Sequence, residues 1–170
     1  TDEYPLTRLS NTNATEIAKV LENSYRAMNI AFIQEWTELA ESANVNLYEV
    51  IDAIRLRPTH SNIMRPGLGV GGYCLTKDPL LASWGSENIL NGKALKQSER
   101  SVVINDRMPL HTFNKILKYF NNSLIDKKVL IMGVSYLSDV GDTRFTPIEL
   151  LYEKLLDAGA SISLVDPYVT

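Results

Sequence analysis

The residue in this sequence best suited to covalent chemistry is Cys74, the only cysteine of the 170-residue chain. It follows a segment, residues 67–72, in which four of six residues are glycine, and Lys77 and Asp78 come three and four positions after it. Glycines leave the backbone open to close approach by another molecule. If a helix starts near Thr76, its free amides and the lysine would favour the thiolate. The segment predicts a nucleophile beside a ligand-binding loop.

Two plainer interpretations of this segment must be weighed. A solitary cysteine is more often a small buried hydrophobic residue than a catalyst. The glycines at 67–72 also match a dinucleotide-binding fingerprint, which requires a preceding strand, a following helix and an acid about 20 residues later. Residues 62–64 make a poor strand, and no strand ending in an acid lies near Asn91. We therefore expect the glycines to contact a substrate rather than a dinucleotide.

Lys19 and Asn23 are a second candidate pair, because residues four apart project from the same face of a helix. A lysine beside a carboxamide stabilises an oxyanion or orients a water molecule. The same spacing is common on solvated helix surfaces, so the pair gains weight only through the cysteine segment. His60 and His111 lie far apart without metal-ligand spacing, and we expect no metal site.

Composition describes an ordinary globular protein, with 45% hydrophobic residues, 22% charged residues and a net charge of -3. The mildly acidic balance argues against nucleic-acid binding. A single cysteine excludes an intrachain disulfide and favours a cytoplasmic setting. Apolar runs are too short to cross a membrane, and no signal peptide opens the chain. The chain starts at Thr1 without a methionine and reads like part of a larger protein.

The first predicted element is a helix from Ala14 to about Ala43, with Asn13 and Glu16 as a capping box. No glycine or proline interrupts it, and apolar residues recur near helical spacing. A helix of about 30 residues far exceeds the usual 11–12 residues. Helices of that length commonly form a hub or a subunit interface, so we expect a homodimer through residues 14–43.

Three further helices are expected in the first 120 residues. One covers 47–56, before Pro58, and a short one follows the glycine segment and ends near Trp84. The last runs from about 93 to 120, and Pro109 should kink or interrupt it.

The C-terminal part predicts a β-α-β unit. Residues 128–133 form a short apolar strand, and residues 161–166 form a second strand that ends in an aspartate. Between them lies an amphipathic helix over 146–158, with Pro147 in its first turn and Gly159 as its C-cap. This is the opening of a doubly wound nucleotide-binding fold. The expected fold class is a mainly helical domain followed by an incomplete α/β unit.

Three segments together resemble the nucleotide-sugar 6-dehydrogenase family, which oxidises UDP-glucose and UDP-N-acetylhexosamines. Residues 16–32 are similar to the family's central helix, and residues 69–79, GVGGYCLTKDP, are similar to its active-site cysteine motif. The segment 141–147, GDTRFTP, with Asp166 and Pro167, is similar to the start of its UDP-binding domain. The cysteine motif is specific, whereas the other two segments are weak alone.

The resemblance implies a central dimerisation domain over residues 1–124 and the start of a UDP-binding domain over 125–170. It implies a missing NAD-binding domain, so the chain by itself should be inactive. The implied reaction oxidises the C6 alcohol of a UDP-sugar to a carboxylate with two NAD+. Two other functions stay open. One is a dimerisation module without activity, and the other is a cysteine-independent 6-phosphogluconate or 3-hydroxyacid type of dehydrogenase.

The resemblance also implies roles for particular residues. Cys74 would attack the aldehyde intermediate and form a thioester, Asp78 would help activate water, and Lys19 and Asn23 would stabilise oxyanions. The segment lining the substrate would comprise Arg65, Gly67, Leu68, Gly69, Val70 and Gly71. Positions that approach NAD are Lys77 and Arg144.

One departure concerns the substrate. The family usually has a Phe-Lys pair where this chain has Tyr136 and Leu137. The missing lysine removes an expected substrate contact. Pro66 and Gly67 resemble the N-acetylhexosamine dehydrogenases, whereas Tyr73 and Lys77 resemble the glucose type, so the sugar is left open.

Overall fold

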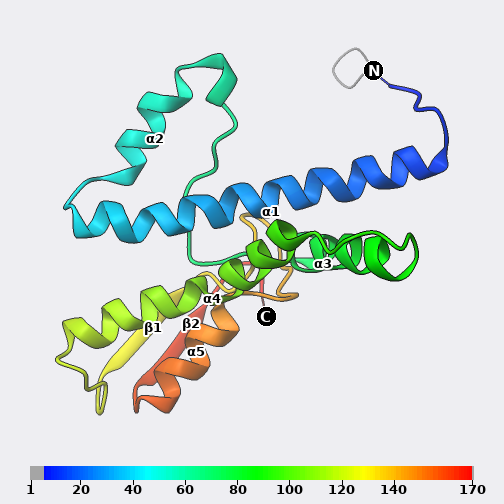
Figure 1. Ribbon diagram of the computed structural model, residues 1–170. Coiled ribbons are helices and arrows are strands. Elements are labelled where there is room, and N and C mark those ends of the chain that lie inside the picture. The colour runs from blue at the N-terminus through cyan, green and yellow to red at the C-terminus, as the bar shows by residue number, and fades with distance from the viewer. Residues whose placement is uncertain (1–5, 170) are drawn as a thin grey trace.

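The computed structural model describes residues 6–169, which form a mainly helical unit followed by a small parallel sheet (Figure 1). This confirms the expected fold class. The elements in chain order are α1 (Thr12–Ser42), α2 (Leu47–Arg55), the 3-10 helix η1 (Pro58–His60), α3 (Tyr73–Asn88), α4 (Lys96–Tyr119), β1 (Lys128–Met132), α5 (Ile148–Asp157) and β2 (Ser161–Val165).

The predicted long helix exists, but its cap is not the predicted one. Helix α1 has 31 residues and is capped by Asn11, whose side-chain oxygen accepts a 2.9 Å hydrogen bond from the amide of Ala14. Asn13, the expected cap, lies inside the first turn. Asn11 supplies the same capping chemistry two residues earlier, and nothing between the two asparagines prevents helix formation. The helix ends where Asn44 takes a φ of 55°, which stops further winding.

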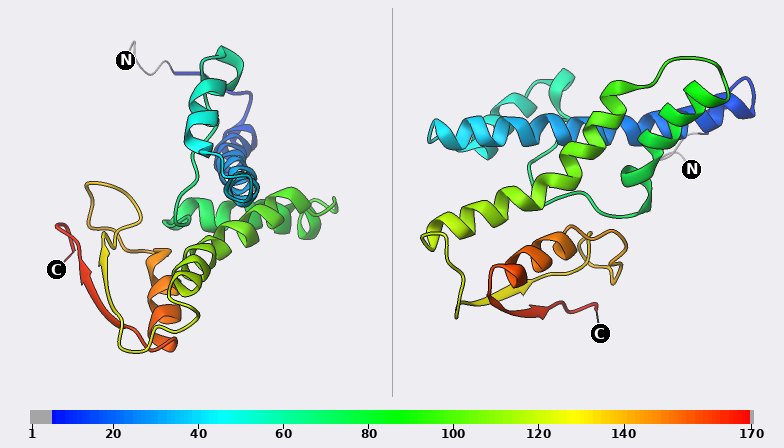
Figure 2. Two further views of the ribbon diagram at one scale, coloured as in Figure 1. Left: turned by 90° about the vertical axis from the view of Figure 1, so that its left-hand side faces the viewer. Right: turned by 60° about the horizontal axis from the view of Figure 1, so that its bottom comes forward.

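Helix α1 is the spine of the helical unit, and both α3 and α4 pack against it (Figures 1 and 2). The buried residues Ala27 and Ala31 have short side chains that allow a close approach. At this contact the buried side chain of Asn105 donates a 3.0 Å hydrogen bond to the carbonyl of Ala27. The packing fixes the two α1 side chains that matter below, Lys19 and Asn23, opposite helix α3.

Of the two outcomes expected at Pro109, a kink or an interruption, the interruption does not occur. Helix α4 runs continuously from Lys96 to Tyr119 with Pro109 buried inside it. The right-hand view of Figure 2 shows that the helix changes direction along its length, the response expected when a proline removes one backbone hydrogen bond.

The β-α-β prediction is confirmed. Strands β1 and β2 pair in parallel, with Lys128 opposite Ser161 and Met132 opposite Val165. Gly159 ends α5 with a φ of 90°, as expected of a C-cap glycine, whereas Pro147 is the N-cap rather than a first-turn residue. The core of this unit is formed by six buried residues: Leu124, Ile131, Ile148, Leu151, Leu155 and Ala160.

The last turns of α4 help to bury that core, since Phe113 and Phe120 pack against it. The two parts of the chain are therefore joined through apolar contacts as well as through the connecting segment. Within residues 6–169 no helix is long and apolar enough to cross a membrane.

Candidate active site

Cys74 lies in the first turn of α3, the second residue of that helix, and is exposed. The helix runs from Tyr73 to Asn88, so it is longer at both ends than the predicted helix, which was expected to start near Thr76 and end near Trp84. Gly72 precedes it with a φ of 80°, a conformation that glycine adopts without strain. Cys74 therefore lies at the N-terminal end of α3, where free backbone amides favour negative charge.

Asp78 is one turn further along α3, and its side chain is 2% exposed. One carboxylate oxygen, Oδ2, accepts hydrogen bonds from Nζ of Lys19 at 2.5 Å and from Nδ2 of Asn23 at 2.7 Å. The other oxygen, Oδ1, accepts a hydrogen bond from Nζ of Lys77 at 3.0 Å. Among the described residues Asp78 is the only buried acidic side chain, and three side-chain donors surround it.

These donors decide the charge of the cluster. Burial of the Asp78 carboxyl opposes its ionisation, but hydrogen bonds from Lys19, Asn23 and Lys77 outweigh burial and lower its pKa to about 2. The hydrogen bond to Asp78 raises the pKa of Lys19. At neutral pH the cluster therefore holds a carboxylate and an ammonium group in contact.

Lys19 also reaches the cysteine, since its Nζ lies 3.8 Å from Sγ of Cys74. The four residues predicted to be catalytic, Cys74, Lys19, Asn23 and Asp78, thus meet in one cluster between α1 and α3. Lys19 and Asn23 come from a helix more than fifty residues away in sequence from the other two. The arrangement places a positive charge beside the Cys74 sulfur and a buried carboxylate on the other side of that charge.

The predicted glycine loop has no regular structure, and no strand precedes it within the described chain. Its glycines are close to other parts of this chain. A side chain at Gly69 would collide with Pro147, and one at Gly71 would collide with Tyr136. Gly67 has open space around it. Close packing within the chain therefore accounts for two of these glycines, and the expected contact with a substrate stays a prediction.

The remaining loop residues face different surroundings. Arg65 pairs with Asp52 of α2 at 2.5 Å, which holds its guanidinium toward that helix. Leu68 packs against the core of the β-α-β unit, whereas Val70 lines a cavity. The loop is tied to α1 by Asn29, which accepts a hydrogen bond from the amide of Met64 and donates one to the carbonyl of residue 62.

The two residues expected to approach NAD are both cations near the start of α3. Lys77 lies over the ring of Tyr73, 5.0 Å from its centroid. Arg144 binds both carboxylate oxygens of Asp142, and its carbonyl accepts a 2.9 Å hydrogen bond from the amide of Gly72. Hydrogen bonds from the Arg144 side chain and backbone lower the pKa of Asp142 to about 2. The guanidinium side chain is 65% exposed and so accessible to a ligand.

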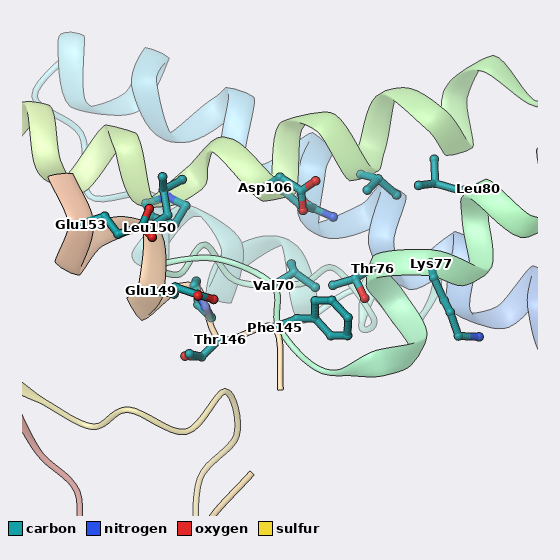
Figure 3. A pocket seen from close by; sticks show the side chains of 14 residues that line it. Val70, Thr76, Lys77, Leu80, Asp106, Phe145, Thr146, Glu149, Leu150 and Glu153 are labelled. Atoms are coloured by element: carbon teal, nitrogen blue, oxygen red, sulfur yellow. The ribbon is translucent and has the colours of Figure 1, made fainter. Parts of the chain in front are cut away.

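A cavity of about 460 Å³ lies between α3, α4 and the start of α5 (Figure 3). Thr76 and Leu80 enter it from α3, Asp106 from α4, and Phe145 and Glu149 from the chain around α5. Burial raises the pKa of Asp106. Cys74 does not line this cavity, but Lys77, which donates a hydrogen bond to Asp78, does, so the cavity borders the cysteine cluster.

The residues that hold the cysteine loop from the C-terminal part of the chain were not predicted from the sequence. Tyr136 and Phe145 pack against Gly71, Gly72 and Tyr73. From the sequence, Tyr136 was singled out only because it stands where the family usually has phenylalanine. Three glycines in a short stretch signal close approach, but nothing in the sequence names the approaching residue.

Comparison with known proteins identifies the family. The chain belongs to the UDP-glucose/GDP-mannose dehydrogenase family, whose central-domain model matches residues 13–106. It is 36% identical over 160 residues to a UDP-N-acetyl-D-mannosamine dehydrogenase of Methanocaldococcus jannaschii, a match covering 94% of this chain and 35% of the relative. A UDP-glucose 6-dehydrogenase of Rattus norvegicus is 28% identical over 161 residues, covering 94% of this chain and 33% of that protein.

A solved structure has the same fold. The NDP-N-acetyl-D-galactosaminuronic acid dehydrogenase from Methanosarcina mazei Go1 superposes with a TM-score of 0.82 at 32% identity, covering 92% of this chain and 35% of that one. The chain therefore spans about a third of the length of the curated relatives it matches.

Proposed function

We propose that this chain supplies the covalent half of a UDP-sugar 6-dehydrogenase, which oxidises a sugar C6 alcohol to a carboxylate through a thioester on Cys74. The observation that carries the proposal is the position of Lys19, whose ammonium group contacts both the Cys74 sulfur and the buried Asp78 carboxylate. Such a cluster serves a reaction in which negative charge develops on an oxygen attached beside the sulfur.

The proposed chemistry begins with the aldehyde that the first oxidation produces. The Cys74 thiolate attacks C6, and the carbonyl oxygen becomes an oxyanion. Loss of hydride from C6 converts this adduct into a thioester, and water then cleaves the carbon–sulfur bond to release the carboxylate and the thiol. NAD+, when bound, accepts the hydride in each of the two oxidations.

Within this scheme the cluster residues have distinct roles. Lys19 and Asn23 stabilise the oxyanions that form during attack and hydrolysis. A carboxyl with a pKa of about 2 is a weak base. We therefore assign Asp78 to orienting the water and holding Lys19 in place, rather than to accepting a full proton at neutral pH.

Lys77 and Arg144 fit a role toward NAD. Both carry positive charge near the first turn of α3, and their side chains are 46% and 65% exposed. Exposed cations suit the negatively charged phosphates of a dinucleotide. The glycine loop residues Gly67 and Val70 would contact the sugar nucleotide.

We propose that residues 1–124 belong to a central domain with the cysteine and that residues 125–170 open a UDP-binding domain. Leu124, at this boundary, already packs in the core of the second unit. The sugar itself stays open, because the relatives act on both UDP-N-acetyl-D-mannosamine and UDP-glucose. Leu137, where the family usually has lysine, cannot provide a charged contact to the nucleotide.

We also propose that the protein forms a homodimer through α1. One stripe of this helix exposes large apolar side chains, each between 47 and 64% accessible: Ile17, Leu21, Phe32, Trp36 and Leu39. At 3.6 residues per turn the stripe spans an arc of about 100°, and Lys19 and Asn23 lie roughly opposite it. A largely apolar groove of about 1040 Å³ runs beside the stripe, between α1 and α4. A second copy would bury this face while leaving the cysteine cluster free.

Sedimentation equilibrium tests the dimer. We expect a dimer at micromolar concentration and a monomer for Trp36→Glu, because a carboxylate in the apolar stripe would be desolvated. Tyr119→Glu, at an 81% exposed position off the stripe, is the matched control and should stay dimeric. A monomeric unmodified chain would contradict the proposal.

The reaction is tested with Cys74→Ser in a full-length protein that carries this chain. We expect the first oxidation to continue and carboxylate formation to fall by at least about a thousandfold, since a lost nucleophile has that effect. Unchanged carboxylate formation would favour a cysteine-independent dehydrogenase instead.

A further inference from the structure

We propose that Tyr136 is a positioning residue for Cys74, through which the β-α-β unit fixes the start of α3. This inference rests on the proposed function for the importance of Cys74, but its geometry and its test do not. The contact crosses from the segment after β1, residues 133–147, to the residues directly before the cysteine.

Tyr136 fills the space that glycines leave free at two successive positions. At Gly71 an added Cβ would collide with the Cβ of Tyr136 and would lie 2.8 Å from the carbonyl oxygen of Phe145. At Gly72 an added Cβ would lie 2.7 and 2.8 Å from two carbon atoms of the Tyr136 ring. Distances below 3.0 Å leave no room for a methyl group, so the ring and these glycines are matched in shape.

Two further contacts extend the same interface toward the cysteine. The amide of Gly72 donates a 2.9 Å hydrogen bond to the carbonyl of Arg144. The rings of Tyr73 and Phe145 lie 5.7 Å apart at a tilt of 54°. Three consecutive residues, 71 to 73, are thus held from one side immediately before Cys74.

The segment that holds them is itself anchored. Asp166, after β2, accepts hydrogen bonds from the amides of Val134 and Ser135 at 2.7 and 3.0 Å. The amide of Tyr136 donates a 3.1 Å hydrogen bond to the carbonyl of Asp142. The hydroxyl of Thr146 donates to the carbonyl of Val134 at 2.6 Å. Tyr136 therefore stands on a braced segment rather than on a free loop.

Cys74 is consequently placed from two directions. Lys19 and Asn23 of α1 hold α3 one turn after the cysteine, through Asp78. Tyr136 holds the same helix at its N-terminal start, just before the cysteine. Because Cys74 is exposed already, removing Tyr136 should change where the sulfur sits more than how accessible it is.

The chain's single cysteine makes this testable without sugar or NAD. We would measure the rate at which Cys74 reacts with neutral iodoacetamide and with anionic iodoacetate in the 170-residue chain. Tyr136→Ala should slow the iodoacetate reaction at least about threefold more than the iodoacetamide reaction, because the sulfur moves away from the positive charge of Lys19. Tyr136→Phe, which keeps the ring, should react like the unmodified chain.

Two matched variants complete the experiment. Tyr119→Ala removes the same ring from an exposed position elsewhere and should leave both rates unchanged. Gly71→Ala keeps the Tyr136 side chain but places a methyl group in the space that this side chain occupies. It should reproduce the larger loss of rate with iodoacetate than with iodoacetamide. If Tyr136→Ala lacks the helical circular dichroism of the unmodified chain, Gly71→Ala and Tyr136→Leu decide instead.

An unchanged ratio of the two rates in these variants would overturn the proposal. So would a faster reaction with both reagents, which would mean that the ring covers the thiol rather than positions it. Since no substrate is involved, a failed thioester mechanism would leave this result intact, and the reverse also holds.

Discussion

Three described aspartates have a pKa of about 2, and two of them, Asp78 and Asp166, reach it for different physical reasons. Asp166 follows β2 and is stabilised by the backbone amides of Ser135, Val134 and Tyr168. Asp78 is buried in α3 and is stabilised by side chains, two of them from a helix 55 and 59 residues away in sequence. The same pKa therefore arises at two kinds of site, one built from backbone donors and one from side-chain donors.

The difference lies in what the donors are able to do. Backbone amides at a strand end are fixed by the sheet, so the Asp166 contacts brace a loop and little else. The lysine and carboxamide around Asp78 keep further donor capacity, and Lys19 turns one of its hydrogens toward the Cys74 sulfur. We take the first carboxylate as structural and the second as part of a reaction site.

The largest predicted effect comes from removing the buried carboxylate. Asp78→Leu keeps the branched shape of the side chain with somewhat more volume, but leaves the buried amide of Asn23 without a partner, so we expect the free energy of unfolding to fall by about 2 kcal/mol. Asp166→Leu should cost less, since its amide donors are close to water. Urea denaturation of both variants checks this order, and a larger loss at Asp166 would contradict the comparison.

Acid should weaken the fold through both aspartates. Their folded pKa values, about 2, lie below the ordinary value of 3.8, so their contribution is complete above about pH 4 and is lost as the pH falls toward 2. Asp78→Asn removes one such contribution, and its stability should therefore decline less steeply between about pH 4 and pH 2. Urea unfolding at several pH values measures the slope, and an unchanged slope would argue against the Asp78 hydrogen bonds.

A pair of lysines separates the structural from the reactive role of the Asp78 cluster. Lys19 and Lys77 both bind this carboxylate, but of the two only Lys19 contacts Cys74. Lys19→Met should slow alkylation of Cys74 by iodoacetate by about three- to tenfold, because a positive charge beside the thiolate is lost. Lys77→Met is the matched control and should have a weaker effect. Equal effects would remove the special role of Lys19.

The smallest effect is expected at the structural aspartate. Asp166→Asn keeps one carbonyl oxygen able to accept the amides of Val134 and Ser135, so overall stability should change little. Hydrogen exchange at these two amides, followed by NMR, should be faster, because their hydrogen bonds to a neutral carbonyl are weaker than those to a carboxylate. Slower alkylation of Cys74 in this variant would show that the loop is less firmly braced than its hydrogen bonds indicate.

Local patterns in the sequence predicted most of the fold. The long helix, the β-α-β unit and the Gly159 cap follow from periodicity and from residue types that have one conformational use. The start of α1 was misplaced because Asn11 and Asn13 offer the same capping chemistry. Of the kink or interruption expected at Pro109, the interruption does not occur, because tertiary packing buries that proline inside a continuous helix.

The site was predictable in its members but not in its connections. The spacing of Lys19 and Asn23 shows that they share a helix face, and the resemblance to a family joined them to Cys74. That Lys19 lies between the sulfur and Asp78 depends on how α1 packs on α3. The close packing of Gly71 against Tyr136 joins residues that are 65 positions apart in the sequence. Neither distance is encoded in a local pattern.

The most direct test of the central claim uses a full-length protein that carries this chain, with Asp78→Asn to slow thioester hydrolysis. After incubation with UDP-glucose or UDP-N-acetyl-D-mannosamine and NAD+, intact-protein mass spectrometry should find a sugar-nucleotide adduct on Cys74 that alkaline hydroxylamine removes. The same variant with Cys74→Ser should show no adduct. Turnover of the sugar without any adduct on Cys74 would contradict the account.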